Sequence, residues 1–96
     1  MKHTKHSPIV PTWTFGDRLR KARRQAHLEQ SDVAALCGVS TAAVSAWEND
    51  DSKPRRLMAV AQQVAEATGV DQLWLLGLTD GNNDPRDFQM NLSLAA

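Results

Sequence analysis

Apolar residues along this chain recur at helical spacing, and short turn-forming segments separate the stretches in which they do so. The clearest stretch ends at Gly69, and its apolar residues follow the i, i+3, i+4, i+7, i+8 pattern of an amphipathic helix. They are Leu57, Val60, Ala61, Val64 and Ala65. Because glycine readily takes the left-handed conformation that ends a helix, this stretch predicts a helix that stops at Gly69 and buries one face.

Two helices are predicted in the first part of the chain. Thr14 is a good N-cap for a helix over residues 15–26, and Asp17 places an acid in its first turn. A shorter apolar pattern occupies residues 30–37, and Gly38 follows it as a residue suited to the end of a helix.

A third helix is predicted over residues 41–48, with Ser40 as its cap. Val44 and Trp47 are three positions apart and therefore share one face. The remaining positions lie on other faces, so this helix is expected to combine a packing face with a second, different role.

A short fifth helix is predicted between Asp71, a suitable cap, and Gly77. No stretch shows the alternation of a half-buried strand, so the pattern predicts an all-α bundle of five helices. We expect three parts: a flexible basic arm over residues 1–12, one domain over 13–78 and a flexible tail over 79–96.

The net charge of the 96-residue chain is zero, but the charge is unevenly distributed. Residues 1–30 hold seven Lys and Arg against two acids, whereas residues 31–96 hold four against nine. Because binding to nucleic acid responds to local charge, the neutral sum does not exclude such a partner. The cations between residues 18 and 24 are equally consistent with an ordinary solvated helix face.

Several other classes of protein are disfavoured. The apolar runs are too short for a membrane span, and no secretory signal is evident, so we expect a cytoplasmic protein. Cys37 is the single cysteine, and His3 and His6 have no further ligands near them in the sequence, so neither a metal nor another cofactor is expected. No nucleophile–base pair or phosphate loop indicates an enzyme.

The window from Gln30 to Asn49 has the spacing of a helix-turn-helix. Its fifth position is Ala34 and its ninth is Gly38, which suit the close contact between the two helices and the positive φ of the turn. Five apolar positions are spaced to hold the two helices together. They are Val33, Cys37, Val39, Val44 and Trp47.

With its flanking segments, this window resembles the lambda-repressor-like helix-turn-helix family, also called Cro/repressor or Xre-type domains. The matching segments are FGDRLRKARRQAHLEQSDVAALCGVSTAAVSAWEND, then Lys53-Pro54, then GVDQLWLLGL. The resemblance implies a compact five-helix bundle that binds double-stranded DNA. A helical bundle whose Ala34 and Gly38 match the pattern by chance is the alternative.

The resemblance also implies roles for individual residues. The second helix would lie across the DNA backbone and the third would enter the major groove. The residues implied in phosphate contact are Gln30, Ser40, Ala43 and Lys53, with Arg20, Arg55 and Arg56 as weaker candidates. Those implied in base readout are Thr41, Ala42, Ser45 and Ala46. Arg23 and Glu48 match a structural ion pair that joins the first helix to the third.

The four residues implied in base readout have short side chains. None carries the bidentate fork that Arg, Asn or Gln presents to a base. We therefore expect methyl contacts to thymine from Thr41, Ala42 and Ala46. Single hydrogen bonds are expected from the hydroxyls of Thr41 and Ser45. Discrimination within one half-site should then be modest and should be supplemented by DNA shape.

The chain departs from the family pattern in three places. His27 stands where a glycine is common, and Glu29 stands in place of a Ser or Thr cap, so the second helix is expected to be less well capped. The usual Asn-Gly-Lys is Asn49-Asp50-Asp51, which brings two carboxylates close to the expected phosphates. We expect the turn to survive, because Asp tolerates the left-handed conformation, but repulsion should weaken DNA binding.

The leading hypothesis is a phage or bacterial repressor that binds a two-fold operator as a homodimer. Trp74, Leu75 and Leu78 are the candidate dimer residues, with Trp74 equally consistent with a place in the monomer core. The alternative is a protein-interaction module, such as an antitoxin or an adaptor, built on the same fold.

Both ends of the chain offer further hypotheses. The basic arm can follow DNA or have no role, and the second option is favoured. The C-terminal residues Leu94, Ala95 and Ala96 are similar to degradation signals that bacterial AAA+ proteases recognise, although many chains end in alanine by chance.

Overall fold

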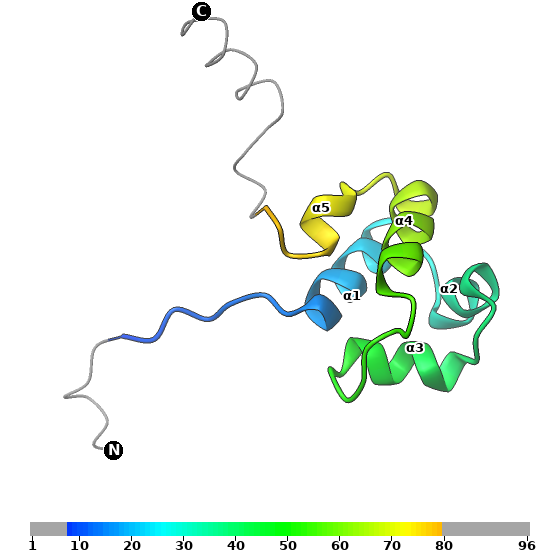
Figure 1. Ribbon diagram of the computed structural model, residues 1–96, viewed down its shortest axis with the longest axis horizontal. Helices are drawn as coiled ribbons and strands as arrows, with labels where there is room; N and C mark the ends of the chain where they lie inside the picture. The colour runs from blue at the N-terminus through cyan, green and yellow to red at the C-terminus, as the bar shows by residue number, and fades with distance from the viewer. Residues whose placement is uncertain (1–7, 80–96) are drawn as a thin grey trace, which may run out of the picture.

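The computed structural model describes residues 8–79 of the chain, and within this range it contains five helices and no strand (Figure 1). The helices are α1 (Phe15–Gln25), α2 (Gln30–Cys37), α3 (Thr41–Glu48), α4 (Leu57–Thr68) and α5 (Gln72–Leu75). The all-α prediction is confirmed, and the predicted helix ends agree with the observed ones to within about two residues, which is the usual uncertainty of a helix end.

Helix α1 occupies the centre of the bundle, where it packs against α3, α4 and α5 (Figure 1). Each helix contributes buried apolar side chains to a single core. These are Leu19, Ala22, Val33, Ala34, Val44, Trp47, Val60, Ala61, Val64 and Leu75. Since Leu75 is fully buried, its side chain is not available to a second subunit, which corrects its assignment to a dimer interface.

Short polar side chains define where the helices begin. The Thr14 hydroxyl accepts a hydrogen bond from the Asp17 N–H, and the Asp17 carboxylate accepts one from the Thr14 N–H, which together form the capping box of α1. At α2 the Asp32 carboxylate accepts a bond of 2.7 Å from the backbone N–H of Glu29. Asp32 therefore secures the backbone just before α2, although the Glu29 side chain makes no cap hydrogen bond of its own.

Residues 8–12 are exposed and extend away from the helices (Figure 1). Trp13 packs its ring 5.9 Å from that of Trp74 and so joins this segment to α5. The first seven residues of the predicted arm, with His3 and His6, lie outside the described residues. The predicted tail from residue 80 onward, with Leu94, Ala95 and Ala96, also lies outside them.

Residues 8–79 offer neither a membrane span nor a cluster of metal ligands. None of the helices there is long and apolar enough to cross a membrane. The same residues contain no group of three His, Cys, Asp or Glu side chains that could hold a metal ion.

Candidate nucleic-acid interface

Helices α2 and α3 form one rigid unit around a tight turn. Gly38 takes the left-handed conformation (φ 69°), and the N–H of Val39 donates to the carbonyl of Ala34 over 3.0 Å. Ser40 then begins α3 by accepting a hydrogen bond from the N–H of Ala43. Of the five predicted apolar positions, Val33, Val44 and Trp47 are buried in the core. Cys37 packs against the core and is partly buried, while Val39 is 36% exposed.

Helix α3 has the two faces that its sequence predicts. Val44, Trp47 and Glu48 are buried. The four residues expected to read bases lie elsewhere on the helix, with Thr41 and Ala42 exposed and with Ser45 and Ala46 half-buried. The outward surface is therefore made of hydroxyls and methyl groups on short side chains, which a groove edge can approach closely.

Glu48 links three helices from a buried position. Its carboxylate accepts hydrogen bonds from Arg23 Nε (2.6 Å) and Arg23 Nη2 (3.0 Å) on α1 and from Gln30 Nε2 (3.0 Å) on α2. The structure thus brings Arg23 and Glu48 together as a bidentate ion pair, and the Glu48 side chain in it is fully buried.

The charge state of Glu48 follows from these partners. Burial alone would raise the pKa of its carboxyl, but hydrogen bonds from Arg23 and Gln30, with the charges of Arg23 and Arg20, lower the pKa below its ordinary value. The carboxylate therefore stays ionised and holds α3 to α1 and α2.

Gln30 lies at a small cleft at the start of α2. The cleft has a volume of about 520 Å³, and Arg24, Ser31 and Thr41 also line it. Gln30 Nε2 donates a hydrogen bond to Glu48, and this contact holds the side chain where it lines the cleft. Arg24 was not among the sequence candidates. Its exposure could have been predicted from its position next to Arg23. One step along a helix turns a side chain by about 100°, here from the buried face toward solvent.

The remaining phosphate candidates differ in what they can offer. The N–H of Ala43 already donates to Ser40, so this group is committed to the start of α3. Lys53 is exposed, and with Arg55 and Arg56 it borders a groove of about 650 Å³ beside the turn between α2 and α3. The structure thus gathers these three cations around one groove that α3 also lines.

The basic residues of α1 divide by function. Arg20 Nη2 donates to the carbonyl of Glu48 (3.0 Å) and to Asn49 Oδ1 (3.1 Å), so it caps the end of α3. Arg18 Nη1 donates to the carbonyl of Trp74 (3.1 Å), with its guanidinium 4.9 Å from the Trp74 ring. Both contacts are internal to the domain.

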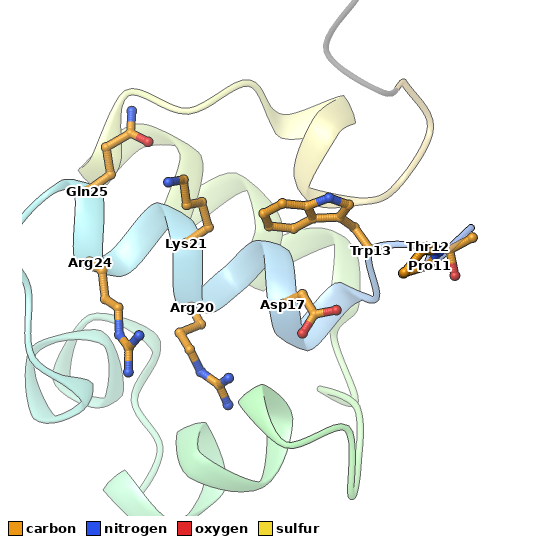
Figure 2. Close-up of a pocket in the computed structure, with 8 residues that line it drawn as sticks. All are labelled: Pro11, Thr12, Trp13, Asp17, Arg20, Lys21, Arg24 and Gln25. Carbon is orange, nitrogen blue, oxygen red and sulfur yellow. The ribbon is translucent and has the colours of Figure 1, made fainter. Parts of the chain in front are cut away.

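Lys21 and Arg24 are the exposed cations of α1, and they border an open groove with Trp13. Figure 2 shows Arg20 and Arg24 extending to the side of α1 on which α3 lies, whereas Lys21 and Gln25 extend to the other side. Of these two exposed cations, Arg24 is therefore the one that faces the helix-turn-helix.

The turn after α3 keeps its shape, because Asp50 adopts the expected left-handed conformation with φ 60°. Its carboxylate does not extend freely into solvent, since it accepts hydrogen bonds from Thr14 and Gly16 at the start of α1. Of the two loop acids expected to repel phosphates, Asp50 is thus engaged within the domain, while Asp51 is exposed.

The candidate dimer residues lie in different environments. Trp74 is half-buried between the core, Trp13 and Arg18. Leu78 is 70% exposed and its N–H donates to the carbonyl of Leu73, whose side chain is 52% exposed, while Trp13 is 53% exposed. Exposed apolar side chains near one another are typical of a surface that a protein partner covers.

Comparison with known proteins agrees with this geometry. A family model described as helix-turn-helix matches residues 19–71, which include α2, α3, α4 and most of α1. No curated protein and no solved structure matches the chain.

Proposed function

Because this chain belongs to the Xre/lambda-repressor-like helix-turn-helix family, whose members are DNA-binding transcription regulators, we propose that it is a phage or bacterial repressor that binds a two-fold operator as a homodimer. The observation that carries the proposal is the outward surface of α3, where small side chains stand exposed on a helix that Glu48 holds in place.

The proposed contacts divide between positioning and reading. Gln30, Lys53 and the hydroxyl of Ser40 contact phosphates and set the register of the domain on the duplex, with Ala43 lying close to the DNA backbone. Thr41 and Ser45 then supply single hydrogen bonds to base edges. The methyl groups of Thr41, Ala42 and Ala46 also contact the methyl group of thymine.

A dimer follows from the small number of contacts that one domain can make. Two copies on half-sites about 34 Å apart would supply the affinity and specificity that one copy lacks. Trp13, Leu73 and Leu78 are exposed apolar residues that support a subunit interface, and the Trp74 ring packs against that of Trp13. As such a repressor, the protein would act in the cytoplasm, where its operator lies.

Selection of bound sites from a random duplex library tests the proposal. A palindromic consensus is expected, and sedimentation of the complex should give two protein copies for each duplex. Affinity for the selected site should fall with salt at a slope of about −0.9 for each phosphate contact. Absence of binding at low salt would instead favour a protein-interaction module, and a consensus without symmetry would overturn the homodimer.

A further inference from the structure

The turn that ends α3 contains a residue whose backbone favours glycine. Asp50 has φ 60°, and the N–H groups of Asp50 and Asp51 donate to the carbonyls of Trp47 (3.1 Å) and Ala46 (2.9 Å). These two bonds form a Schellman motif, in which glycine is the usual left-handed residue. An aspartate at this position costs free energy, which the interactions of its side chain can offset.

Both oxygens of the Asp50 carboxylate bind the start of α1. Oδ1 accepts from the Gly16 N–H over 3.1 Å, and Oδ2 accepts from the Thr14 hydroxyl over 2.6 Å. The Gly16 N–H belongs to the first turn of α1, whose N–H groups have no partner within the helix and carry the positive end of its dipole. Asp50 is thus a second cap for α1, supplied from 34 residues further along the chain.

This contact depends on an unusually close approach of the two helices. A Cβ at Gly16 would lie 2.5 Å from the Trp47 carbonyl oxygen and 2.6 Å from that of Glu48, so only glycine fits there. One turn further along α1, Arg20 donates to the Glu48 carbonyl and to Asn49. The C-terminal end of α3 is therefore held against α1 by backbone and side-chain groups together.

We propose that Asp50 is a positioning residue for DNA recognition. Its carboxylate ties the end of α3 to the start of α1, and this tie sets the angle at which the outward side chains of α3 meet the groove. The proposal rests on the operator binding proposed above. Removing this negative charge beside DNA should therefore weaken operator binding. Electrostatic repulsion alone predicts the opposite, a gain in affinity, because a carboxylate repels phosphates.

The decisive comparison is Asp50→Gly against Asp51→Asn. Asp50→Gly relieves the backbone and removes a charge, so without the proposed role it would bind the selected operator at least as tightly as the wild type. We expect about a tenfold loss of operator affinity and little change on a non-operator duplex. Asp51→Asn, which removes the neighbouring exposed charge, should raise affinity for both duplexes by about twofold or less. Undiminished operator binding by Asp50→Gly would overturn the proposal.

The assays are made at a temperature at which circular dichroism shows every variant folded. If Asp50→Gly does not fold, Asp50→Asn takes its place, since it keeps the size and one acceptor oxygen, and a loss of about threefold is expected. Unchanged operator binding by Asp50→Asn would then overturn the proposal.

Hydrogen exchange on the free protein tests the tie without DNA. The Gly16 amide should exchange at least several-fold faster in the Asp50 variants than in the wild type, and unchanged protection would count against the tie itself. A wild-type protein that binds no duplex at low salt, yet shows this change in exchange, would contradict the proposed function and leave the structural tie intact.

Discussion

The turns that follow α1 and α3 have the same backbone but are held in place by different means. His27 (φ 62°) and Asp50 (φ 60°) are the two residues other than glycine with positive φ in the described part of the chain. Each turn has the paired hydrogen bonds of a Schellman motif. The imidazole of His27 is exposed, whereas the carboxylate of Asp50 binds the start of α1.

Arg23 joins these two turns. Its Nη1 donates to the carbonyl of Leu28 (3.0 Å) in the turn after α1, and its other nitrogens bind Glu48 at the end of α3. The turn after α1 otherwise relies on its local backbone, while the end of α3 relies on contacts from α1. Substitutions at the α3 end should therefore cost more stability and should also disturb recognition.

Arg23→Met should have the largest effect, because it removes the partner that both turns share. The Glu48 carboxylate would remain buried without its bidentate partner, and breaking a buried pair in this way costs about 3–5 kcal/mol. Urea unfolding followed by circular dichroism measures the loss. Arg24→Met, at the exposed neighbour, should change the free energy of unfolding by less than about 0.5 kcal/mol. Similar losses in both variants would contradict the role given to the pair.

Gly16→Ala tests the close approach at the α3 end. Helix propensity alone predicts a gain of about 1 kcal/mol. The new Cβ would meet two backbone carbonyl oxygens at 2.5 and 2.6 Å, so the helices must separate, at a cost of about 1–3 kcal/mol. We expect net destabilisation in urea unfolding together with weaker operator binding. A more stable variant would show that α1 and α3 do not need this contact, and Lys21→Ala on the exposed side of α1 is the control.

Acid should loosen the α3 end before the turn after α1. The pKa of Glu48 in the folded protein lies below its ordinary value of 4.5, so its contribution to stability is complete above that value and is lost as the pH falls through the folded pKa. The wild type should thus lose stability below about pH 4.5, measured as the urea midpoint between pH 6 and pH 3. Glu48→Gln should flatten this dependence, and parallel curves for the two proteins would rule out Glu48 as its source.

Much of the fold was predictable because helix ends depend on local residues. Apolar spacing, the cap at Thr14 and glycine at position 38 predicted helices that agree with α1, α2 and α3. The surviving turn at Asp50 was also predictable, since aspartate tolerates positive φ. The family match then supports DNA binding, while the individual contacts stay predictions.

Contacts across the bundle were not predictable from local pattern. The partners of Asp50 lie 34 and 36 positions away, and they meet it only because α1 and α3 cross closely at Gly16. Arg20 was a candidate for phosphate, yet it caps α3. Leu75 lies on the buried side of α5, and a helix of four residues has too few apolar positions to show its face in advance.

His27→Gly should have the smallest effect, and its sign is the sharpest test of the comparison between the two turns. Glycine relieves the positive φ of this turn by about 1 kcal/mol, and its greater freedom in the unfolded chain offsets part of that gain. We expect a net stabilisation of about 0.5 kcal/mol in urea unfolding, with operator affinity unchanged. Asp50→Gly makes the same backbone change but should weaken operator binding. If both glycine substitutions instead stabilised the protein and left operator affinity unchanged, the carboxylate of Asp50 would contribute no more than the exposed imidazole of His27, and the difference between the turns would be one of sequence alone.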